Sequence, residues 1–198
     1  MLQHKKAFVV YLSFIANIIN SMFTNLTRWS FCGDFNGLPK SIIIVAPHTS
    51  YWDAIIGKYF LLKLGIPHRF LSKKQLFWFP FSVILRLFGC VPVGGVKGHN
   101  AINEVCKMLH RTDNLHIVVC PEGGFAPTNR WNPGFYYMAV KANVPIVVAY
   151  IDYRRKEAGI KKVIYNMDNM KQIYCEIREL YSGVTAKYPE KFELPEIK

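Results

Sequence analysis

The chain lacks any pair of cysteines at C-x-x-C spacing. Five cysteines are scattered along its 198 residues, which indicates neither a zinc site nor a disulfide framework. Most of them lie in apolar runs, where a small buried thiol is the usual case, and such thiols fit a reducing cytoplasm. We therefore expect no metal site. The cysteines are Cys32, Cys90, Cys106, Cys120 and Cys175.

Acidic residues are scarce, because 13 Asp and Glu stand against 25 Lys and Arg, which gives a net charge of +12. A charge of this sign suits anionic lipid headgroups or nucleic acid, and a merely solvated basic face is the third interpretation. The chain carries none of the sequence signatures of the common nucleic-acid modules. We therefore expect an anionic membrane surface, and no nucleic acid, as a partner.

A membrane-spanning helix needs about 20 apolar residues, which the uncharged run at residues 7–23 does not reach. This run follows two lysines and is interrupted by Asn17, Asn20 and Ser21. These features favour a helix lying in the headgroup plane, ahead of a spanning helix, a signal peptide or a helix packed on the protein core. We divide the chain into an N-terminal interfacial or membrane-anchoring helix (residues 1–28), one globular domain (29–186) and a polar tail (187–198), expected to be loose.

Strand and helix patterns alternate along the globular domain. The alternation predicts a single α/β domain with a mostly parallel sheet, flanked by helices and joined by right-handed crossovers. Strands are expected at residues 29–33, 42–45, 68–71, 91–95, 115–120, 145–150 and 162–166. Helices are expected from the cap at residue 49 or 50 to about residue 65, and at 100–110, 133–142 and 168–180.

Residues 73–89 combine aromatic and basic side chains in one short segment. Phe77, Trp78, Phe79, Phe81 and Phe88 lie beside Lys73, Lys74 and Arg86. Aromatic rings and cations together are typical of a lipid headgroup boundary, so the segment is predicted to contact a membrane or an acyl chain. The alternative is an aromatic-rich pair of core helices around Pro80.

A histidine follows the most strand-like run of the chain. Residues 42–45 are β-branched, and a proline then stops the strand. His48 comes next, at the corner into a helix capped by Thr49 or Ser50, with Asp53 about one turn into that helix. A carboxylate in this position holds one imidazole nitrogen, and the other nitrogen is then free to take a proton from an attacking group. The alternative is a surface histidine with a helix-capping aspartate.

A second block with the same design lies further along the chain. The apolar strand 116–119 ends at Cys120-Pro121-Glu122-Gly123-Gly124. Together with His48 to Asp53 and Val144-Pro145-Ile146, this block resembles the signature blocks of the glycerolipid acyltransferase family. That family includes the 1-acylglycerol-3-phosphate acyltransferases, and the resemblance is closest to short bacterial members. It covers roughly residues 29–183.

The resemblance implies transfer of a fatty acyl group from an acyl carrier protein or coenzyme A thioester to a lysolipid or related lipid acceptor. It implies no cofactor beyond that co-substrate, and a location on the cytoplasmic face of the cell membrane. His48 would be the general base, with Asp53 beside it, and Glu122 would shape the acceptor site. The backbone N–H groups of Gly123 and Gly124 are candidates for stabilising the oxyanion. No G-x-S-x-G elbow is present, so no covalent acyl-enzyme is expected.

The chain departs from the family pattern where the family has arginines. Phe125 stands where the third block continues to an arginine, and Gly94-Gly95 where the second block has a basic pair. Arginine suits bidentate phosphate contacts, so these losses favour an acceptor other than lysophosphatidic acid, such as an amino-lipid, a different lysolipid or a neutral alcohol. Arg130, Lys97 or Arg69 could restore a phosphate contact.

Two other functions are compatible with the same fold. One is a non-catalytic lipid-binding protein in which the altered blocks mark lost activity. The other is an acyl-thioester hydrolase, which would use water as the acceptor and release free fatty acid whether or not a lysolipid is present.

Overall fold

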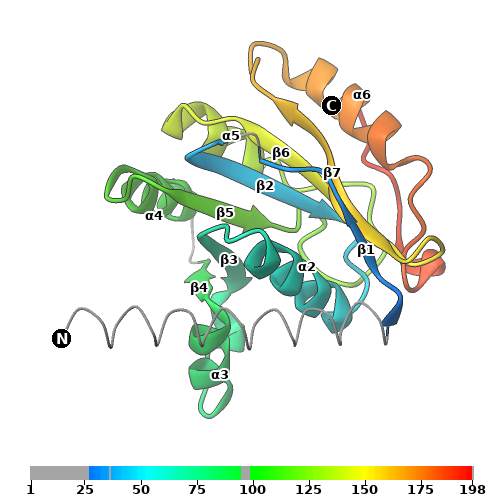
Figure 1. Ribbon diagram of the computed structural model, residues 1–198. Helices are drawn as coiled ribbons and strands as arrows, with labels where there is room; N and C mark the ends of the chain where they lie inside the picture. Colours follow the sequence, from blue (N-terminus) through cyan, green and yellow to red (C-terminus); the bar gives the residue numbers. More distant parts are fainter. Residues whose placement is uncertain (1–26, 36, 95–98, 198) are drawn as a thin grey trace, which may run out of the picture.

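The computed structural model describes residues 27–35, 37–94 and 99–197. Seven strands form one sheet in the order β1-β7-β6-β2-β5-β3-β4 (Figure 1). Five neighbouring pairs are parallel, and β6 with β7 is antiparallel, so the predicted mostly parallel sheet is confirmed. The strands are β1 (Ser30–Cys32), β2 (Lys40–Ala46), β3 (His68–Lys73), β4 (Cys90–Val93), β5 (Leu115–Val119), β6 (Ile146–Asp152) and β7 (Glu157–Ile164).

Helices cover both faces of the sheet, α4, α5 and α6 on one side and α2 and α3 on the other (Figure 1). The helices are α2 (Tyr51–Lys63), α3 (Phe81–Phe88), α4 (His99–His110), α5 (Gly134–Ala142) and α6 (Met170–Tyr181), with the short 3-10 turns η1 (Lys74–Leu76) and η2 (Pro189–Lys191). The result is the expected single α/β domain.

The middle strand β2 is buried because its side chains have an apolar core on each face. Ile42 and Ile44 point into the core formed with α4, α5 and α6, whereas Ile43 points into the core formed with α2 and α3. β2 is also hydrogen-bonded to β5 on one side and to β6 on the other. The carboxyl end of β2 is therefore held rigidly, and this fixes the position of the corner that carries His48.

Strand β7 differs from the expectation for residues 162–166. It begins at Glu157 and returns antiparallel to β6. A glycine within the strand concealed its pattern in the sequence. Gly159 is required at this point because a Cβ there would clash with the carbonyl oxygen of Cys32. The bare backbone lets β1 pair with β7 at the edge of the sheet.

Residues 74–88 leave the sheet as η1 and α3. No residue of α3 is buried, so the alternative of a core helix pair is wrong. Leu85 and Phe88 nevertheless pack partly on the core of this face and attach the helix to the domain.

The polar tail is held in place rather than loose. The guanidinium of Arg178 donates to the carbonyl oxygen of Pro195 (2.8 Å), and the N–H of Glu196 donates to the carbonyl oxygen of Asn129 (2.8 Å). Within the described ranges, no helix has the length and apolar character needed to cross a membrane. Of the expected N-terminal helix, residues 1–28, all but the last two residues lie outside the described residues.

Candidate active site

Polar groups gather where four neighbouring strands end. Strands β6, β2, β5 and β3 are adjacent and parallel, so their carboxyl ends share one edge of the sheet. His48 follows β2, Glu122 follows β5, Tyr153 follows β6, and Lys73 is the last residue of β3. Open α/β sheets place their chemistry just outside this edge. The fold thus brings residues far apart in the sequence to a common site.

The first turn of α2 fixes the Asp53 carboxylate. Ser50 is the N-cap, and its Oγ accepts from the N–H of Trp52 (3.1 Å). Asp53 reaches back, and its Oδ2 accepts from the N–H groups of Thr49 (2.7 Å) and Ser50 (2.8 Å). The hydroxyl of Tyr153 donates to its Oδ1 (2.6 Å). Three hydrogen bonds thus hold a carboxylate that is 2% exposed.

His48 lies against this carboxylate. Its Nδ1 is 3.5 Å from Oδ2 of Asp53, a contact of opposite charges once the ring is protonated. Nδ1 is buried and makes no hydrogen bond of good geometry, as is common for catalytic pairs before a substrate binds. The His48 backbone N–H donates to Oε1 of Glu122 (2.7 Å), which ties the corner after β2 to the block after β5. Nε2, on the far side of the ring, is the nitrogen that remains for proton transfer.

The pKa values of His48 and Glu122 both differ from the ordinary values of these side chains. Burial lowers the pKa of His48, but the neighbouring Cys120 sulfur and the Asp53 carboxylate more than compensate, and the pKa ends well above its ordinary value of 6.5. Burial raises the pKa of Glu122 to about 7, although the hydrogen bond from the His48 backbone opposes the rise. Perturbed groups in contact at a strand edge are typical of functional sites.

Of the two backbone N–H groups expected to stabilise an oxyanion, those of Gly123 and Gly124, the turn after β5 leaves one available. Gly123 has a positive φ of 73°, and its N–H donates to the carbonyl oxygen of Cys120 (3.1 Å), so this donor is committed to the turn. Gly124 keeps its N–H as the remaining candidate for an oxyanion. A Cβ at Gly124 would lie 3.6 Å from Nζ of Lys73, so the lysine ammonium stands beside the turn.

Phe125 packs against the histidine, with the two ring planes tilted by 52°. Its ring centroid is 4.8 Å from that of His48 and 4.8 Å from that of Tyr51, which meets it edge-on. An apolar ring therefore stands beside His48 at the sequence position where the family pattern has an arginine.

The loop that carries Phe125 is closed at its base. The N–H of Asn132 donates to the carbonyl oxygen of Pro121 (2.8 Å), and the indole of Trp131 is fully buried and donates to the carbonyl oxygen of Glu193 (3.2 Å). The loop between β5 and α5 is thus a compact loop with its ends bonded together.

Of the predicted site residues, six meet at this edge: His48, Asp53, Glu122, Gly123, Gly124 and Phe125. Arg130 is exposed in the closed loop, and nothing in the described part of the chain holds its guanidinium at the site. Arg69 is the second residue of β3 and so lies toward the opposite edge of the sheet. Lys97 lies outside the described residues.

Sequence reasoning missed Tyr153 and Lys73 as members of the site. Tyr153 stands three residues past the predicted strand end, and Lys73 appeared as half of a basic pair. The usable signal for both was their position at the end of a parallel strand. Within residues 27–35, 37–94 and 99–197, no three His, Cys, Asp or Glu side chains gather closely enough to hold a metal ion.

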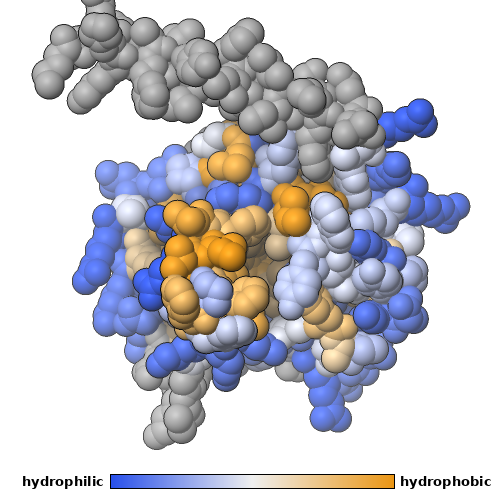
Figure 2. All heavy atoms as spheres, turned by 90° about the horizontal axis from the view of Figure 1, so that it is seen from below, coloured by the Kyte–Doolittle hydropathy of each residue, from blue (hydrophilic) through white to orange (hydrophobic). Residues whose placement is uncertain are grey.

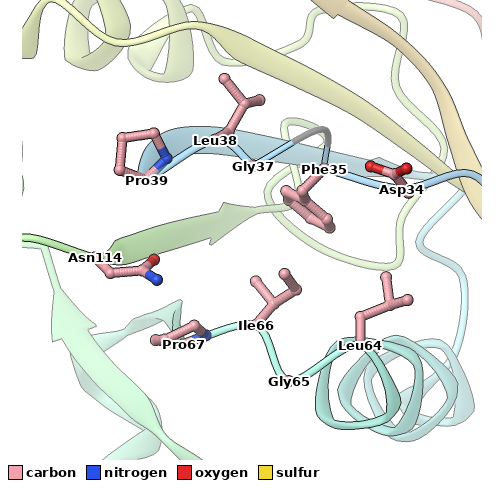
Figure 3. Close-up of a pocket in the computed structure, with 10 residues that line it drawn as sticks. All are labelled: Asp34, Phe35, Gly37, Leu38, Pro39, Leu64, Gly65, Ile66, Pro67 and Asn114. Carbon is pink, nitrogen blue, oxygen red and sulfur yellow. The ribbon is translucent and has the colours of Figure 1, made fainter.

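One hollow of the described surface lies away from these residues. Its lining comes from the segments that lead into β2, β3 and β5, as Figure 3 shows for Leu38, Pro67 and Asn114 among others. These are the amino ends of the strands. His48 lies at their carboxyl ends, so this hollow is separate from the candidate site.

Comparison with known proteins gives an independent assignment. Residues 33–152 match a family model described as Acyltransferase. The crystal structure of the 1-acyl-sn-glycerophosphate (LPA) acyltransferase PlsC from Thermotoga maritima is similar to this chain, with a TM-score of 0.55 and 18% sequence identity. The likeness covers 94% of this chain and 86% of that one, and it shows a shared fold. A comparison with curated protein sequences finds no match.

Proposed function

Since the family model matches more than half of its residues, this chain belongs to the acyltransferase family, and we propose that it moves a fatty acyl group from an acyl thioester to a lipid acceptor. The observation that carries the proposal is the meeting of His48, Asp53 and Glu122 at one strand edge. The thioester of acyl carrier protein or coenzyme A is the proposed donor, and the reaction takes place on the cytoplasmic face of the cell membrane.

His48 acts as the general base. Its Nε2 takes the proton from the acceptor hydroxyl or amine as that atom attacks the thioester carbonyl carbon. The Asp53 carboxylate, 3.5 Å from Nδ1, stabilises the imidazolium that forms. The three hydrogen bonds on Asp53 keep it in place while the charge on the ring changes. The raised pKa of His48 makes it a strong base once it is neutral.

The attack creates a tetrahedral intermediate with a negative oxygen. The Gly124 N–H is the proposed backbone donor to this oxygen, and the Lys73 ammonium beside the same turn adds positive charge. When the intermediate collapses, the carbon–sulfur bond breaks and the thiolate leaves with the proton held by His48. The products are the acylated lipid and a free thiol, and no bond to the protein forms.

The acceptor is proposed to be a lipid other than lysophosphatidic acid. The Phe125 ring packs against His48, so the acceptor meets an apolar wall close to the reacting atoms. Lys73 is one exposed cation and does not provide the planar pair of donors with which arginine grips a phosphate. A neutral alcohol, an amino-lipid or a lysolipid with another headgroup fits these surroundings better.

The reaction is tested with purified protein, labelled acyl thioesters and a lipid extract, followed by mass identification of the new ester or amide. His48→Ala should remove nearly all turnover while the circular dichroism stays native. His110→Ala on α4 is the matched control and should keep its activity. Undiminished turnover by His48→Ala would exclude the mechanism. Free fatty acid formed equally with and without lipid would indicate a hydrolase, and thioester binding without any product would indicate a binding protein.

Acceptor choice is tested with a panel of lysolipids, monoacylglycerol and amino-lipids. Phe125→Arg should shift preference toward lysophosphatidic acid, and Phe125→Leu, which removes the ring without adding a cation, should not. If the unaltered protein prefers lysophosphatidic acid by a wide margin, the proposed acceptor class is wrong.

A further inference from the structure

The segment around α3 exposes an unusual amount of apolar surface. Seven large apolar side chains within residues 76–87 are exposed, with Phe79 at 81% and Leu87 at 83%. The seven are Leu76, Trp78, Phe79, Phe81, Val83, Ile84 and Leu87, called here the α3 patch. Figure 2, which looks onto this side of the molecule, shows apolar side chains gathered in one region ringed by hydrophilic ones. A contiguous patch of this kind marks an interaction surface.

The α3 patch is not a poorly packed piece of core. Phe77, Leu85 and Phe88 turn toward the domain and pack against its apolar core, which fixes the helix in place. Val83, Ile84 and Leu87 lie on the outward side of the same helix. The segment therefore has a side that attaches it to the domain and a side that meets its surroundings.

The charges around the α3 patch are of one sign. The sequence has no acidic residue between Asp53 and Glu104. Lys73, Lys74 and Arg86 lie within or beside the patch and are exposed. An apolar surface bordered by cations and free of carboxylates complements an anionic lipid headgroup layer, where rings and alkyl chains enter and cations meet phosphates.

The α3 patch adjoins the candidate active site. Lys73 ends β3 directly before η1, and its Nζ lies beside the Gly124 turn. Tyr51 (72% exposed) and Trp52 (54% exposed) begin α2, which covers the same face of the sheet as α3 (Figure 1). A lipid surface that receives α3 therefore also comes close to the mouth of the site.

We propose that the α3 patch inserts into the headgroup and upper acyl region of an anionic bilayer. The inserted helix seats the domain so that the sheet edge with His48 faces the membrane. As a corollary that rests on the proposed function, the lipid acceptor reaches the site from the bilayer without crossing bulk water.

Insertion is tested with the full-length chain and vesicles of phosphatidylcholine, with or without phosphatidylglycerol, by sedimentation. Binding should be stronger when phosphatidylglycerol is present. Leu87→Gln and Phe79→Gln should each weaken binding by about tenfold, as expected when one large side chain loses apolar contact. Val140→Gln is the matched control, because Val140 is a 47% exposed apolar residue of α5 on the opposite face of the sheet, and its binding should not change.

A second readout locates the contact. Phosphatidylcholine brominated on its acyl chains should quench the fluorescence of Trp78, and the part of the quenching due to this residue should disappear in Trp78→Phe. Equal binding by Leu87→Gln and the unaltered chain, with no quenching of Trp78, would overturn the proposal and place membrane contact elsewhere. A change of oligomeric state in Leu87→Gln with unaltered vesicle binding would also overturn it, in favour of a second copy on the patch.

These measurements need no turnover, so they remain decisive if the proposed chemistry fails. If the membrane insertion and the acyl transfer both occur as proposed, Leu87→Gln should lower acyl transfer to vesicle-borne acceptors. Transfer to a detergent-dispersed acceptor should stay within about twofold of that of the unaltered chain. A fall in both assays would contradict the corollary.

Discussion

Replacing Asp53 with asparagine separates two roles that one carboxylate combines. Asp53 closes the first turn of α2 through the N–H groups of Thr49 and Ser50, and it also lies 3.5 Å from the His48 ring. Asparagine is nearly isosteric, and its oxygen can still accept from the two backbone donors. Its amide can meet the oxygen of the Tyr153 hydroxyl. The substitution therefore removes the negative charge with little change of shape.

The expected loss of stability follows from the hydrogen bonds. Hydrogen bonds to a charged group contribute about 1.5–3 kcal/mol, and neutral ones about 0.5–1.5 kcal/mol. Asp53 accepts three, and each loses about 1 kcal/mol or slightly more with the charge, so the free energy of unfolding should fall by about 3–4 kcal/mol. For a chain of this length that corresponds to roughly 6–16 °C in Tm.

The expected loss of activity in Asp53→Asn is larger than the loss of stability alone would cause. A positioned base contributes about 10²–10⁴ in rate, and Asp53→Asn should lose a factor in this range. Ser50→Ala is the matched control, since it removes the cap bond to Trp52, costs about 1 kcal/mol, and leaves the carboxylate beside His48. Both variants should be assayed well below their measured Tm values, with unfolding followed in urea.

The pH dependence distinguishes chemistry from structure. Asp53 helps to raise the pKa of His48, so the acid limb of the rate profile should move to lower pH in Asp53→Asn and stay in place in Ser50→Ala. The reasoning is refuted if Asp53→Asn retains its activity. It is also refuted if the variant loses no more activity than Ser50→Ala and its acid limb does not move.

Glu122→Gln should remove a group that titrates near pH 7, so the part of the rate profile that changes there should flatten while the hydrogen bond from the His48 N–H persists; an unchanged profile would contradict this. His116 is fully buried and its pKa is lowered to about 4, so its contribution to stability is complete above pH 6.5 and is lost as pH falls toward 4. The stability advantage of the unaltered chain over His116→Asn, measured in urea, should therefore shrink by about 2 kcal/mol between about pH 7.5 and pH 5, and a constant difference would refute it. Gly159→Ala should destabilise by about 1–3 kcal/mol by forcing β1 away from β7, whereas Gly57→Ala, in open space within α2, should stabilise by about 0.5–1 kcal/mol; the urea midpoints decide both signs.

The parts of the fold that the sequence predicted are those where one local signal dominates. The β-branched run of β2 and the proline after it placed His48 at the corner correctly, because burial on both faces leaves such a run few alternatives. Strand β7 was partly missed because Gly159 and two lysines interrupt its pattern, and its place depends on β1, which lies far away in the sequence.

The sequence predicted the signature residues of the site but not all of the side chains that surround them. His48 and Asp53 could be named because a histidine at a recognisable strand end is followed by a carboxylate one helical turn on, and Glu122 because its block resembles a family signature. Tyr153 and Lys73 were missed, because a position at a strand end indicates a role only once it is known which strands lie side by side. The use of the Gly123 N–H within its own turn is likewise visible only in three dimensions.

The closed loop after β5 has a consequence for protein engineering. Because Pro121 and Asn132 are joined at its base and Trp131 anchors it, the intervening residues form a replaceable cassette. Grafting residues 125–130 from another member of the family, with Gly124 kept as the proposed oxyanion donor, should transplant its choice of acceptor into this scaffold. The proton-transfer pair sits on a different loop, so such chimaeras should change what is acylated without altering how.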